Sequence, residues 1–193
     1  MLPSTETPDG QEYTVDSLYK AYVDELYSYA VGFGLDKEAA MDAIHDVFCR
    51  ICAREENYVS LQNPRFYLFR ALRNQLIDYY KYESRRGSAE ALERRTGNEL
   101  PYRVLVSIED EMIAGEERRE IEQRVQEILE CLNPRQREII YLRFVQGYSY
   151  EEISGILHIA VPSCRKSLSR AVLKLKRENK LMLFYLLLSI NIG

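Results

Sequence analysis

Apolar side chains recur every three or four residues over much of the chain, and this spacing predicts α-helices. The first predicted helix spans 16–33 and the second spans 37–54. A third begins at Asn63, a capping residue, continues with Pro64, whose missing N–H is tolerated in the first turn, and reaches Tyr82. We expect these three helices to bury Tyr19, Tyr22, Leu26, Tyr29, Phe33, Ala40, Ile44, Val47, Ile51, Phe69, Leu72, Leu76 and Tyr79.

The helical pattern is interrupted in the middle of the chain. Residues 87–116 scatter glycine and proline among charges, which predicts a linker. Helical spacing resumes at Ile121, and two capping boxes follow, one opened by Asn133 and the other by Ser149. The stretch 149–175 predicts a helix-turn-helix with a tight break at its centre. Its expected buried residues are Ile153, either Ile156 or Leu157, Cys164, Leu168, Ala171, Val172 and Leu175.

The composition agrees with a folded, helical protein. The 193 residues are 46% hydrophobic and include only 9 Gly and 6 Pro, which excludes the collagen-like, low-complexity and disordered classes. The N-terminus is polar and acidic without an export signal, so we expect a cytoplasmic protein whose cysteines are reduced thiols. The apolar stretch 181–192 is shorter than the roughly 20 residues that span a bilayer, so we expect no membrane span.

The distribution of charge along the chain is more informative than the net charge. The formal net charge is -4, yet residues 65–86 carry 6 basic and 2 acidic side chains and residues 163–193 carry 7 and 1. Because Lys and Arg hold nucleic acid by its phosphates, two basic islands in an acidic chain favour a DNA partner. Solvated helix faces are the alternative.

The second helix of the predicted helix-turn-helix has the residue types of a major-groove reader. Arg and Lys donate to guanine, and small polar side chains bind phosphates. An ordinary helical hairpin with a basic face is the alternative. The residues that we expect to face outward are Ser163, Arg165, Lys166, Ser167, Arg170 and Lys174.

The sequence does not predict an enzyme. It lacks a glycine-rich phosphate loop, and its two histidines have no nucleophile context. We therefore expect no catalytic residue, no cofactor and no small-molecule substrate.

Two stretches resemble the sigma factors of bacterial RNA polymerase. Residues 132–175 (LNPRQREIIYLRFVQGYSYEEISGILHIAVPSCRKSLSRAVLKL) resemble region 4, and residues 18–86 resemble region 2 through AAMDAIHDVF and PRFYLFRALRN. With regions 2 and 4 alone, the chain resembles the extracytoplasmic-function group.

This resemblance implies an all-α fold of two small helical modules, a region 2-like bundle and a region 4-like helix-turn-helix, joined by a flexible linker. The expected boundaries are 1–14 for a polar tail, 15–86 for the first module, 87–119 for the linker, 120–180 for the second module and 181–193 for an apolar tail. The apolar tail would pack on the second module or meet a partner.

The same resemblance implies a protein that binds RNA polymerase core and promoter DNA, with an anti-sigma factor as a further partner. Polymerase would dock on Asp42, His45, Asp46 and Phe48, where acids four residues apart suit cations on the polymerase and a solvated acidic face is the alternative. The minus-ten element would be melted and bound by Asn57, Tyr58, Gln62, Asn63, Arg65, Arg70, Arg73, Asn74, Asp78 and Lys81. The minus-thirty-five element would be read by Ser149, Tyr150, Ser163, Arg165, Lys166, Ser167, Arg170 and Lys174.

Some positions depart from the family pattern. Lys166 and Ser167 stand where a Ser-Arg pair is frequent, and Ala160 stands where a capping Ser or Thr is common. His45, Cys49 and Cys52 form H-x3-C-x2-C, which resembles the zinc motif of a class of anti-sigma factors. A fourth ligand is missing, so we expect buried thiols and no metal. The alternatives to a sigma factor are a helix-turn-helix regulator that acts without polymerase and a zinc-binding anti-sigma protein.

Overall fold

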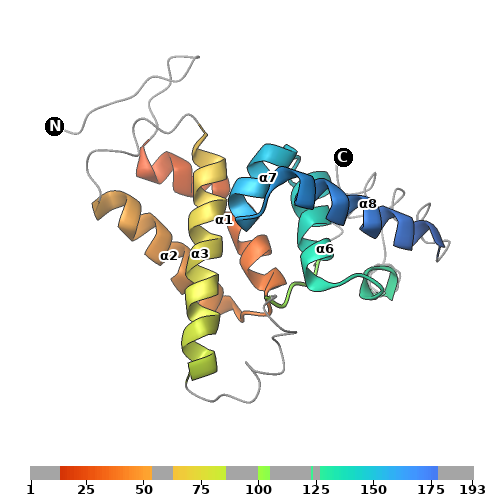
Figure 1. The fold of residues 1–193 in the computed structure, drawn as a ribbon. Helices are drawn as coiled ribbons and strands as arrows, with labels where there is room; N and C mark the ends of the chain where they lie inside the picture. The colour runs from red at the N-terminus through yellow and green to blue at the C-terminus, as the bar shows by residue number, and fades with distance from the viewer. Residues whose placement is uncertain (1–13, 54–62, 86–99, 105–122, 124–126, 178–193) are drawn as a thin grey trace, which may run out of the picture. The chain divides into compact units, whose positions relative to one another are not determined.

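The computed structural model describes residues 14–53, 63–85, 100–104, 123 and 127–177. Every regular element within these ranges is a helix, as the sequence predicts. The chain divides into two compact units, residues 1–93 and 94–193 (Figure 1). No helix in the described ranges is both long and apolar enough to cross a membrane.

The first unit is a bundle of three helices, α1 (Val15–Gly32), α2 (Lys37–Ala53) and α3 (Pro64–Arg85). Each helix packs on the other two. Aromatic rings from two of the helices meet in the core, where the centroid of Tyr29 lies 5.1 Å from that of Phe33 and 5.1 Å from that of Phe69. This packing holds the outward faces of α2 and α3 in fixed positions.

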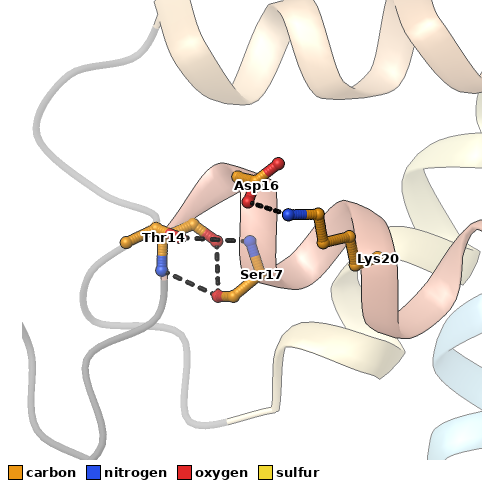
Figure 2. A network of polar contacts seen from close by, with 4 residues as sticks. All are labelled: Thr14, Asp16, Ser17 and Lys20. Carbon is orange, nitrogen blue, oxygen red and sulfur yellow. Dashed lines mark hydrogen bonds and ion pairs between the residues drawn. The ribbon is translucent and has the colours of Figure 1, made fainter.

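Side chains at their N-termini fix where two of these helices begin. Thr14 and Ser17 form a capping box at α1, and Lys20 reaches back 2.7 Å to Asp16 in the first turn (Figure 2). Asn63 caps α3 by accepting a 3.0 Å hydrogen bond from the backbone N–H of Phe66. Such a cap satisfies an N–H that the helix itself leaves unpaired.

The buried side of α3 differs at one aromatic pair from the expectation. Tyr79, expected in the core, is 41% exposed, whereas Tyr80 is 2% exposed. The hydroxyl of Tyr80 donates to the carbonyl of Phe33 just after α1, and this partner explains why the second tyrosine of the pair is the buried one. In α1, Leu18 is buried while Tyr19 and Tyr22 are only half-buried.

The second unit is built around α6 (Pro134–Ile140), the π-helix η1 (Tyr141–Val145), α7 (Tyr150–Leu157) and α8 (Val161–Arg177). Helix α6 packs on α8, α8 packs on α7, and η1 touches α6 and α7. Both predicted capping boxes are present, Asn133 with Gln136 and Ser149 with Glu152. The π-helix continues α6 without a break and was not expected.

Helices α7 and α8 form the helix-turn-helix. His158 ends α7 in the left-handed conformation, with φ of 52°, and its N–H donates to the carbonyl of Ser154. The hydroxyl of Ser154 donates to the carbonyl of Ile159, which ties the turn to the helix. Ile153, Ile156 and Leu157 are all buried, so both of the last two residues belong to the core, where the sequence predicted one of them.

Part of the predicted linker packs on the second unit. Leu100–Val104 is described, both Tyr102 and Val104 are buried, and the ring of Tyr102 lies 5.7 Å from that of Tyr141. The remaining module boundaries stay predictions. Most of the predicted polar tail and linker, and all of the apolar tail, lie outside the described residues.

Candidate nucleic-acid and polymerase interfaces

The acidic face of α2 is exposed, as the docking prediction requires. Asp42, His45 and Asp46 all reach solvent. The Nε2 atom of His45 lies 3.2 Å from the Tyr19 hydroxyl, and the two rings are stacked. Asp46 accepts a 2.8 Å hydrogen bond from Nε2 of Gln75 on α3. These contacts orient the face against its two neighbouring helices.

Phe48 differs from the rest of the predicted docking set. It is only 5% exposed, and its ring meets Tyr19 edge-on with centroids 5.1 Å apart. The expectation that Phe48 itself faces polymerase is therefore corrected. This ring supports the acidic face from beneath.

Two of the predicted minus-ten arginines belong to the fold of the first unit. Arg73 is 4% exposed and cannot line a DNA strand in this conformation. Arg73 follows Leu72 and lies on the same side of α3 as Phe69 and Leu76, which are all buried. Its side chain is therefore buried with the apolar side of the helix. Arg65 is half-buried and joins α3 to α1 through a 2.8 Å ion pair with Glu25.

The polar face that remains on α3 includes Arg70, Asn74, Asp78 and Lys81, all exposed. Asp78 and Lys81 lie 3.4 Å apart, and solvent screens this exposed pair. Asn63 is exposed as well, but its side-chain oxygen caps the helix. Asn57, Tyr58 and Gln62, predicted to hold a flipped base, lie outside the described residues.

A hollow of about 280 Å³ opens between α2 and α3 beside this face. Two guanidinium groups, a phenol and an amide line it with donors, which suits a nucleotide better than an apolar ligand. Its lining residues are Val47, Arg50, Tyr67, Arg70, Ala71 and Asn74.

Helix α8 buries one apolar side and exposes its cations on the other, where Leu173 is exposed as well. Cys164, Leu168, Ala171 and Leu175 are buried, at spacings of four, three and four, whereas Val172 is half-buried. Burial raises the pKa of the Cys164 thiol, with Glu151 adding to the effect. The exposed residues of the predicted reading set are Ser163, Arg165, Lys166, Arg170 and Lys174, and Ser167 is half-buried.

A cluster around Tyr150 connects the start of α7 to α8. The guanidinium groups of Arg143 and Arg165 each lie 5.1 Å from the centre of the Tyr150 ring. Arg143 also donates a 2.8 Å hydrogen bond to the carbonyl of Tyr148, and Arg165 lies 3.5 Å from Glu151. The hydroxyl of Ser149 caps α7, so Ser149 has a structural task besides its predicted contact with DNA.

The C-terminal half of α8 borders a basic groove of about 470 Å³. The amide oxygens of Asn133 and Gln136 are both used in the capping box, so these side chains offer their amide nitrogens to a ligand. Donors therefore surround one exposed apolar side chain, Leu173, which is 54% exposed. The lining residues are Asn133, Gln136, Arg170, Leu173, Lys174 and Arg177.

Comparison with known families identifies the family of the chain. Residues 18–86 match Sigma-70 region 2, and residues 122–175 match Sigma-70, region 4. Two relatives are ECF RNA polymerase sigma factors of Bacillus subtilis (strain 168). SigX is 22% identical over 174 residues, which is 89% of this chain and 86% of SigX. SigM is 23% identical over 172 residues, which is 84% of this chain and 93% of SigM.

The chain belongs to the sigma-70 family, in the extracytoplasmic-function group. It is a sigma factor, which binds RNA polymerase core and directs promoter recognition at the start of transcription. The fold agrees with that of the sigma factor RpoE from Bartonella quintana, solved with the anti-sigma factor NepR. That structure has a TM-score of 0.58 at 22% identity and covers 84% of this chain and 94% of its own.

Several residues beside the faces of this sigma factor were not found from the sequence. Arg177 lies seven residues after Arg170 within the second basic island, so helical spacing could have identified it. Arg50 and Tyr67 line a hollow between two helices, and Arg143 acts across a turn. No spacing in one helix reveals such contacts.

The H-x3-C-x2-C motif does not form a metal site within the described part of this sigma factor. There, no three His, Cys, Asp or Glu side chains gather closely enough to hold a metal ion. Cys49 and Cys52 are exposed, which corrects the expectation that they are buried. His158, the second histidine of the chain, ends α7 in the other unit.

Proposed function

We propose that this sigma factor divides its work among three faces, one for polymerase and one for each promoter element. The observation that carries this assignment is helix α8, where every buried position is apolar and the opposite side exposes cations and serines. That side is firmly supported, because α6 and α7 both pack on α8. A rigid helix with a polar outer side is what major-groove reading requires.

The N-terminal half of α8 reads the minus-thirty-five element. A helix of 17 residues is about 25 Å long, twice the roughly 12 Å width of the major groove, so a helix that enters end-on places its first turns against the bases. Ser163 and Lys166 lie in those turns. Arg170 and Lys174 lie further along and bind phosphates, which fix the register. Ser149, Tyr150, Arg165 and Ser167 complete the interface.

The exposed side of α3 binds the minus-ten element. Arg70, Asn74 and Lys81 follow the strand, and the hollow beside them offers Arg50 and Tyr67 to a nucleotide. Unstacking a base costs a few kcal/mol, which stacking and hydrogen bonds in a pocket can offset. Asn57, Tyr58, Gln62 and Asn63 are proposed to hold that base, with Asp78 at the edge of the face. Arg65 and Arg73 are proposed to stabilise the packing of the first unit and not to contact DNA.

The exposed acids of α2 dock on polymerase core. Asp42 and Asp46 lie four residues apart, and the hydrogen bond from Gln75 to Asp46 orients one of the two carboxylates. His45 stands beside them. Such acids favour a cationic surface on the polymerase, and complementary charge raises the rate of association and fixes the register of the complex.

Three further assignments follow from the family. The protein acts by binding and carries out no catalysis of its own. It works in the cytoplasm, and an anti-sigma factor restrains it, by analogy with the solved complex of RpoE and NepR.

The docking assignment is tested by reversing both acids. Asp42→Lys with Asp46→Lys should weaken binding to polymerase core by on the order of tenfold and leave the helical content intact, because both side chains are exposed. Asp24→Lys, at an exposed position on α1, is the matched control. Unchanged core affinity of the double variant at moderate salt would remove α2 from the docking surface.

Copurification with core distinguishes the sigma factor from the two alternatives. A helix-turn-helix regulator that acts alone would bind DNA without core, and an anti-sigma protein with zinc would retain the metal through dialysis. We expect stable association with core and promoter-dependent transcription. Promoter binding that does not depend on core would contradict the proposal.

A further inference from the structure

The described helix α2 carries two exposed thiols that the sigma function does not use. Cys49 and Cys52 lie in its last turns, and both are exposed. The other cysteines differ from them, because Cys131 is half-buried with its thiol 3.2 Å from the Ile128 carbonyl, and Cys164 is fully buried. Only the first pair combines proximity in sequence with access to solvent.

The spacing of this pair is compatible with a disulfide. Residues three apart in an α-helix have Cα atoms about 5 Å apart, inside the range of roughly 4.4–6.8 Å seen for disulfides. Their Cβ atoms start about 5–6 Å apart and must approach to about 4 Å, so closure has to distort the turn between them.

The distortion would be transmitted to the core and to the docking face. Ile51 lies between the two cysteines and is buried, so a tightened turn displaces its side chain from its packing. Residues 42, 45, 49 and 52 follow one another at spacings of three, four and three, and they lie along one side of α2. The thiols thus stand next to the face of Asp42, His45 and Asp46.

We propose that Cys49 and Cys52 form a redox-modifiable dithiol site that a peroxide closes to a disulfide, and that closure lowers the affinity of the sigma factor for polymerase core. The second part rests on the proposed docking role of α2.

The chemistry balances without any further reagent. One thiol gives up its proton, and its thiolate breaks the peroxide O–O bond to give a sulfenic acid and a hydroxide, which takes up that proton as water. The second thiolate then forms the S–S bond and displaces the sulfenic oxygen as hydroxide, which the second thiol proton converts to water. Two thiols lose two electrons and two protons, and hydrogen peroxide is reduced to two waters.

This chemistry fits a protein in a reducing compartment. Disulfides there are transient and serve catalysis or redox sensing, so the dithiol form is the resting state. A thiol reductant should reopen the bond and restore the intact helix. The site therefore reports an excess of peroxide over the reducing capacity of the cell.

The first experiment maps the thiols of the full chain after hydrogen peroxide. We expect a disulfide between Cys49 and Cys52 at peroxide levels that leave Cys164 reduced, reversed by dithiothreitol. Cys49→Ser and Cys52→Ser should each abolish this product, whereas Cys131→Ser should leave it unchanged. Separate sulfenic or sulfinic acids without the intramolecular disulfide, or disulfides only between chains, would overturn the dithiol site.

The second experiment measures core binding of the reduced and oxidised full chain. Oxidation should weaken wild-type binding by about tenfold, or about 1.4 kcal/mol, and should leave Cys49→Ser and Cys52→Ser close to the reduced wild type. Equal affinity of oxidised and reduced wild type would overturn the regulatory role. The thiol map needs no polymerase, so it still judges the dithiol site if the reversal of Asp42 and Asp46 removes the docking assignment.

Discussion

The two helices assigned to DNA differ in how much of their positive charge faces solvent. On α8 the cations all lie off the buried row of Cys164, Leu168, Ala171 and Leu175, and they are exposed. On α3, Arg73 falls inside a broad apolar side and Arg65 pairs with Glu25. A count of basic residues therefore overstates the DNA-binding charge of α3. The position of a cation relative to the apolar side decides between a structural role and a binding role.

The largest effect that tests this comparison is on stability. Arg73→Ala should lower the free energy of unfolding of the first unit by about 3 kcal/mol, because a buried polar side chain and its packing are lost together. Arg70→Ala, three residues earlier and exposed, should change it by no more than about 0.5 kcal/mol. Urea unfolding followed by circular dichroism measures both. Equal stability of the two variants would place Arg73 among the surface cations.

The next effect concerns DNA binding by α8. Arg170→Ala should lower the affinity for minus-thirty-five DNA by on the order of 1–3 kcal/mol. The binding of the wild-type protein should weaken as the salt concentration rises. Arg165→Ala should cost less, because Arg165 already interacts with Tyr150 and Glu151. Fluorescence anisotropy of the sigma factor with core polymerase gives both values. A larger loss for Arg165 than for Arg170 would reverse the order proposed for the face.

A smaller effect concerns the cap of α7, the helix that packs against the proposed DNA-reading helix α8. Ser149→Ala should lower the stability of the second unit by about 1 kcal/mol, since it removes the hydroxyl that caps α7. Ser169→Ala, at an exposed position within α8, is the control and should be neutral within about 0.5 kcal/mol. Thermal unfolding compares the two. A neutral Ser149→Ala would show that the cap contributes little to the helix-turn-helix.

The smallest effect concerns the acidic remainder of the chain. Residues 1–64 carry 12 acidic and 4 basic side chains, which should repel DNA from the free protein. Removal of residues 1–115 should therefore raise the affinity of the remaining helix-turn-helix for upstream DNA by about threefold. Removal of residues 1–93 is the better-defined cut, because it keeps Tyr102 beside Tyr141. Equal or lower affinity of both fragments at the same salt would contradict the proposed repulsion of DNA by the acidic residues.

Sequence patterns predicted the second unit more completely than the first. The capping boxes, the turn and the buried row of α8 each depend on residues within a few positions of one another, and they were confirmed except at one position of the row. Val172, expected in that row, is only half-buried. In the first unit, the exposure of Tyr79 and the burial of Arg73 depend on contacts between helices. Periodicity within one helix carries no information on which neighbour supplies a partner, so these features could not be predicted.

Run-off transcription tests the central claim, that one unit reads each promoter element, most directly. Reconstituted polymerase carrying Tyr58→Ala or Lys166→Ala, at residues proposed to contact bases, would be assayed on a cognate promoter and on versions mutated in one element at a time. Each variant should lose discrimination only at its own element, so that Tyr58→Ala is insensitive to minus-ten changes and Lys166→Ala to minus-thirty-five changes. Loss of discrimination at both elements by either variant, or at neither element by both, would contradict the division of the promoter between the two units.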